Sequence, residues 1–314
     1  MSRRIVGVFS VALLFVVLIT ACSKDETAAK GPEKKKVALI MKSLANEFFK
    51  TMETGAKTHW KNNPETYDLD CNGIKDEQDV NRQIEIVNQM IAKKVDAIVI
   101  APADSRALIP VCRKAMEKGI VVINIDNKFD SEILEQEGVN ISFVGPNNRK
   151  GAKLAGDYLA QTLNQGDGVA ILEGRPGAFN GIQRKLGFED AMNEAGVEIL
   201  SSQSAYWEQE SAFDIATQIY TKFGENLKAI LCANDNMALG AFQALKGKSV
   251  TIIGFDNISA IQTLIQEDKV LCTVDQHADQ IAVFGIEYAL ELLETGIKAD
   301  DKETQVNLVT KENL

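Results

Sequence analysis

Short apolar runs and longer amphipathic stretches alternate along most of the chain. The apolar runs, typical of buried strands, cover residues 37–41, 67–71, 97–101, 120–125, 141–144, 169–172, 198–202, 229–232, 250–254 and 270–274. The amphipathic stretches, typical of helices, cover residues 50–57, 80–93, 106–118, 148–163, 181–195, 210–223, 237–245 and 279–294. This alternation predicts parallel sheets covered by helices on both faces. Because a sheet usually holds ~4–6 strands, the number of runs favours two α/β lobes.

Polar side chains follow many of these apolar runs at the point where each predicted strand ends. Asp126 and Asn127 follow one run, and Asn234, Asp256 and Gln276 follow three others. Any one of them could simply cap the next helix. Two lobes that face each other would instead gather these strand ends at one cleft, where open α/β sheets bind ligands.

The segment between the first predicted strand and helix combines an amide with two aromatic rings. Asn46, Phe48 and Phe49 lie at this strand-to-helix turn. The two rings could pack beneath the first helix. They could also form an apolar wall beside a polar amide, which suits a sugar ring with its apolar C–H face and hydroxyl rim.

The N-terminus has the pattern of a targeting segment. Arg3 and Arg4 precede the apolar residues 5–19, and small residues come just before Cys22. The apolar stretch is shorter than the ~20 residues of a spanning helix, so residues 1–22 are predicted to be a signal peptide. The cysteine placement resembles a bacterial lipobox, which implies lipidation of Cys22; ordinary cleavage beside an incidental cysteine is the alternative. The polar residues 23–35 are predicted to be a flexible tether.

Composition narrows the class of protein. The chain has 314 residues, 45% of them hydrophobic, and a formal net charge of −10, which argues against a nucleic-acid-binding protein. Four cysteines remain after Cys22, and their even number in an exported chain is compatible with disulfides. Because three of the four lie in or beside apolar runs, free buried thiols are the preferred interpretation.

Several motifs, in order, resemble one family over nearly the whole of residues 36–314. They are Asn46-Glu47-Phe48-Phe49, then residues 151–158 (GAKLAGDY), 233–241 (ANDNMALGA) and 254–256 (GFD). They are similar to the type I periplasmic sugar-binding proteins, the ribose/galactose-binding family of ABC importers. The resemblance implies two doubly wound parallel-sheet lobes joined by three crossovers, near Pro146, Gln276 and Asn307. It divides the chain into an N-terminal lobe of residues 36–146 plus 277–306 and a C-terminal lobe of residues 147–276 plus 307–314.

The resemblance also implies a solute held between the lobes, which close on it. The implied ligand-binding residues are Asn46, Phe48, Phe49, Asp126, Asn127, Arg184, Trp207, Asn234, Asp256 and Gln276. Carboxylates, amides and an arginine fork suit sugar hydroxyls, which both donate and accept hydrogen bonds. Three positions depart from the ribose-binding pattern: Asn127 replaces an arginine, Trp207 a phenylalanine, and Glu47 the proline found in many members. Ribose specificity is therefore less strongly implied than sugar or polyol binding.

The function implied is that of a lipid-anchored solute receptor in the cell envelope. It would bind a monosaccharide or related polyol as a monomer, without cofactor, metal or catalysis, and would deliver it to the permease and ATPase of an ABC importer. The alternatives that keep the fold are a sensory receptor feeding a chemoreceptor or histidine kinase, and a receptor for a nucleoside-like or furanosyl signal. A LacI-like regulator shares the fold, but a secretion signal stands where its DNA-binding segment would be.

Three other patterns favour different chemistry less strongly. Residues 68–79 match the outline of a calcium loop, but Asp79 replaces the usual glutamate and the segment overlaps a predicted strand. Residues 174–181 are glycine-rich, but Pro176 removes one backbone donor that a phosphate cradle would use. Asp126 and Asp256 could imitate a glycosidase pair, although two acceptors for sugar hydroxyls explain them equally. The chain has two histidines and no GxSxG motif.

Overall fold

The computed structural model describes residues 1–2 and 34–314, so Cys22 and most of the predicted signal peptide and tether lie outside the described residues. The strands are β1 (Lys35–Ser43), β2 (Tyr67–Ile74), β3 (Ala97–Ile100), β4 (Val121–Ile125), β5 (Phe143–Pro146), β6 (Gly168–Glu173), β7 (Glu198–Ser204), β8 (Leu227–Cys232), β9 (Thr251–Ile253), β10 (Thr273–Asp275), β11 (Lys302–Thr304) and β12 (Asn307–Val309). The helices are α1 (Glu47–Asn62), α2 (Val80–Lys93), α3 (Ile109–Glu117), α4 (Ser131–Gln136), α5 (Asn148–Ala160), α6 (Phe179–Glu194), α7 (Gln209–Phe223), α8 (Asp235–Ala244), α9 (Ser259–Gln266) and α10 (Ala278–Thr295), with a 3₁₀ turn at Gly224–Asn226.

The strands form two main sheets, and each sheet is parallel. One sheet has six strands in the order β11-β5-β4-β3-β1-β2, and the other has four in the order β7-β6-β8-β9. The antiparallel pair β10-β12 joins the second sheet through a bridge between Ile253 and Cys272. The two-lobe α/β architecture predicted from the sequence is therefore confirmed.

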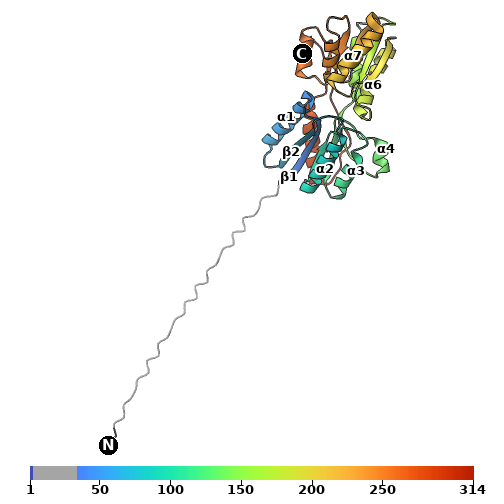
Figure 1. Ribbon diagram of the computed structural model, residues 1–314. Helices are drawn as coiled ribbons and strands as arrows, with labels where there is room; N and C mark the ends of the chain where they lie inside the picture. The colour runs from blue at the N-terminus through green and yellow to red at the C-terminus, as the bar shows by residue number, and fades with distance from the viewer. Residues whose placement is uncertain (3–33) are drawn as a thin grey trace. The chain divides into compact units, whose positions relative to one another are not determined.

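Both faces of each sheet are covered by helices. In the first lobe, α2 and α3 pack on one face while α1 and α10 pack on the other, and Ile98 and Val99 of β3 point to opposite apolar clusters. In the second lobe, α5 packs along α6, and α7 packs along α8. Figure 1 shows α6 and α7 in the lobe that also contains the C-terminus, and α2, α3 and α4 in the other. Burial on both faces explains why β1, β3, β6 and β8 are continuous apolar runs.

The chain passes between the lobes at three places. The first is the short connection from β5 to α5, the second is residues 276–277 between β10 and α10, and the third is the link from β11 to β12. His277 has φ 53°, and its Nε2 lies 2.7 Å from Oδ1 of Asn307. The second and third crossovers are therefore joined by a side-chain hydrogen bond.

Short elements were the ones that the apolar pattern did not predict. The six residues of α4, the eight of α9, and the three-residue strands β11 and β12 are too short for a helical or strand period to be visible. The segment that resembles a calcium loop forms the edge strand β2, paired in parallel register with β1. Residues 68–74 are therefore extended, as the predicted strand required, and do not fold back as a calcium loop does.

The sequence also predicted that the four cysteines after Cys22 are free buried thiols. Cys71, Cys112, Cys232 and Cys272 are free thiols, and all but Cys71 are buried, as their apolar surroundings predicted.

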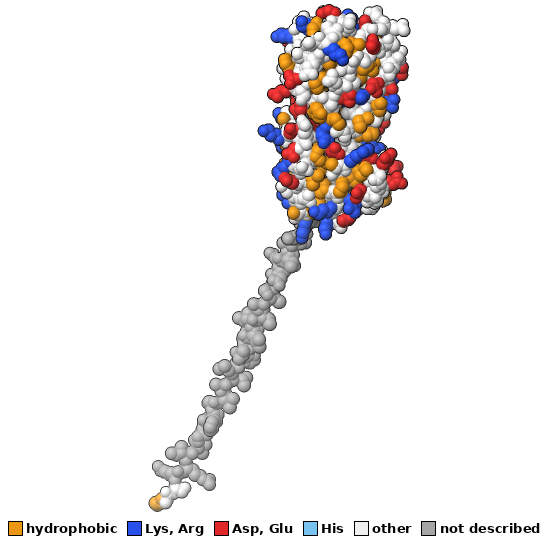
Figure 2. All heavy atoms as spheres, turned by 45° about the vertical axis from the view of Figure 1, so that its right-hand side comes forward, with side chains coloured by type: hydrophobic (Ala, Val, Ile, Leu, Met, Phe, Trp, Pro, Cys, Tyr) orange, Lys and Arg blue, Asp and Glu red, His pale blue; other side chains and the backbone are white. Residues whose placement is uncertain are grey.

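The face drawn in Figure 2 carries acidic and basic side chains interspersed with apolar ones. Among the described helices, none has both the length and the apolar character needed to cross a bilayer.

Candidate functional site

The carboxyl ends of the strands of both lobes converge on one cavity. Twelve residues line it. The lining consists of Lys42, Asn46, Phe48, Phe49, Glu77, Asp126, Asn180, Arg184, Trp207, Asn234, Asp256 and Gln276. Nine of the ten residues implied as ligand contacts by the sequence are therefore brought together, including Phe49, Asp126, Trp207 and Asp256 from both lobes.

Asn127 is the implied contact that the structure does not place in the cavity lining. Its side chain is fully buried next to the cavity, where Oδ1 accepts hydrogen bonds from Ser105 Oγ at 3.2 Å and from the Asn180 backbone at 3.1 Å. Its Nδ2 donates to the carbonyl of Pro102 at 2.9 Å. An amide is shorter than the arginine of the ribose-binding pattern, and its polar atoms are used by the protein itself.

Three lining residues were missed, although the sequence carried a signal for each. Lys42 directly follows the first apolar run, as Asp126 follows another. Glu77 lies in the segment considered for calcium, and Asn180 in the segment considered for phosphate. The signal in those two segments was therefore polar residues after a strand, which was overlooked when the segments were considered only for calcium and phosphate.

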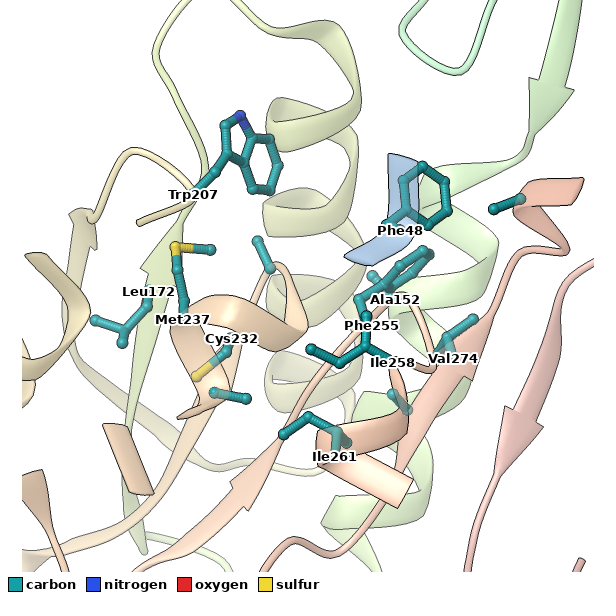
Figure 3. Close-up of a cluster of buried hydrophobic side chains, with 14 of the residues drawn as sticks. Phe48, Ala152, Leu172, Trp207, Cys232, Met237, Phe255, Ile258, Ile261 and Val274 are labelled. Carbon is teal, nitrogen blue, oxygen red and sulfur yellow. The ribbon is translucent and has the colours of Figure 1, made fainter. Parts of the chain in front are cut away.

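Aromatic rings form the apolar part of the cavity. The rings of Phe48 and Phe49 meet edge to face with centroids 5.0 Å apart. Trp207 and Phe48 belong to one buried apolar cluster that also contains Phe255 and Met237 (Figure 3). A Cβ at Gly174 would overlap the indole of Trp207, so this glycine makes room for the ring.

Arg184 is the central cation of the second lobe. It lies on α6 and is 2% exposed. Its Nε donates to Asn148 Oδ1 at 2.8 Å, and its NH1 donates to the carbonyl of Ala233 at 2.8 Å and to Asp256 Oδ1 at 3.2 Å. Its guanidinium carbon lies 3.8 Å from the centroid of Phe255. These contacts hold the planar group in one orientation, and its NH2 makes no hydrogen bond within the described part of the chain.

Lys42 is the corresponding cation of the first lobe. Its Nζ lies 3.1 Å from Asp126 Oδ2 and 3.5 Å from Glu77 Oε2, and all three side chains are buried. Burial lowers the pKa of Lys42, but the charges of Asp126 and Glu77 outweigh it, so the pKa is raised and the ammonium stays charged. The ammonium also lies 5.3 Å from the ring centroid of Phe49.

The buried carboxyl groups titrate unusually because they lie away from water. Burial raises the pKa of Asp256 well above its ordinary value, although the charge of Arg184 opposes this. Burial also raises the pKa of Glu77, against the opposing charge of Lys42. Two cations thus face three carboxyl groups, and the wall already balances most of its own charge.

Several polar atoms of the wall are buried without a partner. Trp207 Nε1 and Gln276 Oε1 have no hydrogen bond within residues 34–314, and neither has Asp126 Oδ2, whose contact is the ion pair with Lys42. Such groups cost free energy unless something satisfies them, roughly 1–3 kcal/mol each. They include both a donor and acceptors, so a partner must be able to accept and to donate.

Three wall residues also have uncommon backbone conformations. Asp126, Trp207 and Asp256 have φ values of 61°, 70° and 124°, a region that residues other than glycine seldom adopt. Each such residue costs on the order of 1–3 kcal/mol, and strained residues concentrate at functional sites. All three side chains line the cavity.

Two asparagines of the wall cap helices and still present a donor. Asn46 Oδ1 accepts from the backbone of Phe48 at 3.0 Å, and Asn234 Oδ1 accepts from that of Met237 at 2.9 Å. Capping uses only the oxygen, so the Nδ2 groups remain to face the cavity, where that of Asn234 also reaches the carbonyl of Trp207 at 3.3 Å. The capping and binding interpretations of these residues are therefore compatible.

The geometry agrees with comparisons to known proteins. A family model described as a periplasmic binding protein domain matches residues 37–298. The chain is 49% identical over 310 residues to the D-ribose/D-allose-binding protein of Pseudomonas aeruginosa, covering 95% of this chain and 97% of that one. It is 30% identical over 280 residues to the D-allose-binding periplasmic protein of Escherichia coli, covering 87% and 89%.

A solved structure extends this likeness to three dimensions. An ABC transporter periplasmic solute-binding protein from Actinobacillus succinogenes with bound D-allose superposes with a TM-score of 0.83 and 37% identity, covering 89% of this chain and 99% of that one. The relatives are named as binding proteins. The chain therefore belongs to the periplasmic binding protein family.

Proposed function

We propose that this protein is the solute receptor of an ABC sugar importer and binds a neutral monosaccharide or polyol between two lobes that close on it. The observation that carries the proposal is the cavity at the strand ends of both lobes, which combines aromatic walls with unsatisfied donors and acceptors. The aromatic rings suit the apolar faces of a sugar ring, and the polar side chains beside them suit its hydroxyl groups.

The electrostatics favour a neutral ligand. Lys42 and Arg184 are already paired with buried carboxylates. A charged ligand would bring an additional charge into a desolvated site, which is costly unless a new partner is supplied. Hydroxyl groups need no counter-charge, and each can accept from Trp207 Nε1 or donate to Gln276 Oε1 and Asp126 Oδ2.

D-Allose and D-ribose are the leading candidates, because similar proteins are named for them. In both sugars, all hydroxyl-bearing stereocentres have the same configuration in the Fischer projection, so one set of wall contacts can serve both. Because Asn127 does not line the cavity, the contact that an arginine would make at this position in the ribose-binding pattern is missing here. We place D-allose first because the solved relative with bound D-allose is 37% identical over 89% of this chain.

The remaining features of the proposal concern the setting of the receptor. We propose the lobe boundaries given above, supported by the pairing of β11 with β5 in one lobe and of β12 with β10 in the other. We also propose a monomer that is anchored through lipidated Cys22 in the cell envelope and delivers its sugar to the permease and ATPase. The support for the anchor is the residue pattern around Cys22.

Isothermal titration calorimetry of the folded protein tests the proposal. The panel consists of D-allose, D-ribose, myo-inositol and D-glucose, the last an epimer of D-allose at a single carbon. We expect saturable heat with one site for D-allose or D-ribose and at least tenfold weaker binding of D-glucose. Protein that is folded by circular dichroism and gives no heat with any member of the panel would contradict the sugar proposal.

A further inference from the structure

Two helices of the second lobe, α6 and α9, have first-turn backbone N–H groups that donate to side chains of the other lobe. The N-cap residue of α6 is Ala178 and that of α9 is Ile258, and neither provides a capping hydrogen bond. The backbone N–H groups of a first helical turn have no partner within the helix, so they need one from elsewhere. Five other helices use an asparagine or aspartate next to them in sequence: Asn46, Asp79, Asp130, Asn147 and Asn234.

The first lobe supplies the caps of α6. The backbone N–H of Phe179 donates to Ser105 Oγ at 3.0 Å, and that of Asn180 donates to Asn127 Oδ1 at 3.1 Å. Ser105 and Asn127 follow β3 and β4, and both are buried. The backbone N–H of Ser105 also donates to the carbonyl of Gly177 at 3.0 Å. Three hydrogen bonds therefore cross between the lobes at the start of one helix.

The first lobe also supplies the cap of α9. Oε1 of Glu47 accepts from the backbone N–H of Ser259 at 2.8 Å, and Oε2 accepts from the Ser259 hydroxyl at 3.0 Å. A carboxylate at a helix N-terminus also gains from the helix dipole. Glu47 is itself the first residue of α1, so the carboxylate spans from one helix start to another.

The capped helix starts lie next to the residues that form the cavity. Asn180 and Arg184 are on α6, and Asp256 is three residues before α9. The caps can form only when the lobes are together, because donor and acceptor belong to different lobes. The same movement that brings Arg184 and Asp256 toward Asp126 therefore gives partners to the backbone N–H groups of Phe179, Asn180 and Ser259.

We propose that Glu47, Ser105 and Asn127 are positioning residues for ligand binding, which fix the closed state by capping α6 and α9 across the cleft. The inference rests on the proposed closure of the lobes around a sugar. None of these three residues lines the cavity. They act through the closure equilibrium, since an interaction present only in the closed state increases affinity by the factor that it contributes to closure. Glu47 and Asn127 are two of the three positions that depart from the ribose-binding pattern.

Two single variants and their matched controls test the inference. Glu47→Ala removes the cap of α9, and Ser105→Ala removes one cap of α6. Glu53→Ala, on the same helix as Glu47, breaks an ion pair with Lys57 within the first lobe, and Ser201→Ala removes a hydroxyl that accepts from Gln203 within the second lobe. The measurements are Kd and dissociation rate constant for the sugar that wild-type protein binds, and the melting temperature without sugar.

We expect each cap variant to weaken sugar binding by roughly 3- to 20-fold, the usual contribution of a helix N-cap, mainly through faster dissociation. The melting temperature without sugar should match that of the control variants, since an open protein has no caps to lose. The conservative variants Glu47→Gln and Ser105→Thr keep an acceptor and should recover most of the affinity.

Unchanged affinity in both cap variants would overturn the inference. So would weaker binding accompanied by an equal loss of melting temperature without sugar, because that pattern belongs to residues with a general structural role. Wild-type protein that binds no sugar of the panel is a different result: it removes the proposed function and, with it, the closure on which the caps depend.

Discussion

The cavity wall and the cleft rim both contain buried polar side chains, but these side chains have different partners. The rim is formed by Glu47, Ser105 and Asn127, which bond to the opposite lobe. In the wall, Trp207 Nε1 and Gln276 Oε1 are buried with no partner in residues 34–314. At the rim, Ser105 and Asn127 are also buried and polar, but they are bonded to the opposite lobe. The comparison teaches that polar side chains after parallel strands have two kinds of partner here: those in the wall keep atoms free for the proposed ligand, and those at the rim bond to the other lobe.

The largest expected effect is the loss of the central cation of the wall. Arg184→Ala removes the fork beside Asp256 and leaves that buried carboxyl without its cation. Truncating one member of a buried charge pair costs roughly 2–5 kcal/mol, so sugar affinity should fall at least about 30-fold. The measurement is calorimetry, with melting temperature recorded in parallel. The matched control is Lys185→Ala, which removes the neighbouring cation, paired with Glu173 outside the cavity. Affinity within twofold of wild type would remove Arg184 from the wall.

The next prediction concerns a carboxyl group that lies beside the wall but is bonded within its own lobe. Asp235 accepts from the backbone of Ile258 at 2.9 Å and from Thr273 Oγ1 at 2.8 Å, and burial raises its pKa from 3.8 to about 6. Because the folded state holds this proton more tightly, Asp235 makes stability fall as the pH rises from about 4 to about 6. The shift of about two units corresponds to about 3 kcal/mol.

Urea unfolding of Asp235→Asn and wild type between pH 4 and pH 7 measures this contribution. The free energy of unfolding of the variant, relative to wild type, should rise by about 3 kcal/mol across this range. A difference that stays constant with pH would show that Asp235 does not titrate as a buried acid. Such a result would also weaken the contrast between charged groups bonded within a lobe and those left for a ligand.

A smaller effect is expected from the aromatic part of the wall. Trp207→Ala removes the ring and its unpartnered N–H, and should weaken binding of a ring-shaped sugar by ~1 kcal/mol or more. Trp207→Phe keeps a ring and should recover part of the loss. Trp60→Phe is the control, since Trp60 lies on α1 away from the cavity lining. Equal affinities for wild type and Trp207→Ala would remove Trp207 from the wall.

The smallest effect on sugar affinity is expected when only the charge of Glu47 is removed. Glu47→Gln retains an acceptor for Ser259 but loses the favourable interaction of a carboxylate with the N-terminus of α9. The expected loss of binding free energy is about 0.3–1 kcal/mol, and it should shrink at high salt. Calorimetry at low and high salt measures it. A loss that is larger than that of Glu47→Ala would contradict a capping role.

The sequence predicted the fold well because buried parallel strands leave a strong pattern. Uninterrupted apolar runs at β1, β3, β6 and β8 were visible without any structure. The same pattern could not show α4 or α9, whose lengths are near two turns, or β11 and β12, which have three residues each. Those elements are stabilised by tertiary contacts, and such contacts leave no period in the sequence.

The site shows where residue type and position stop being informative. Asp126 and Asn127 are adjacent and follow the same strand. Asp126 lines the cavity, whereas Asn127 bonds to the second lobe. The positive φ of Asp126 separates the two directions, and nothing in the residue types predicts it. Lys42 and Glu77 form their ion-pair network with Asp126 across loops 35 residues apart, a pairing that only the folded sheet reveals.

The most direct test of the claim that sugar binds in this cavity uses the fluorescence of Trp207, which lines it. The sequence has two tryptophans, so Trp60→Phe leaves Trp207 as the only indole. Titrating this variant with the sugar that gives heat in calorimetry should produce a saturable change in Trp207 emission with the same Kd as the heat. Emission that stays constant while the heat saturates would place the sugar away from this cavity and contradict the account.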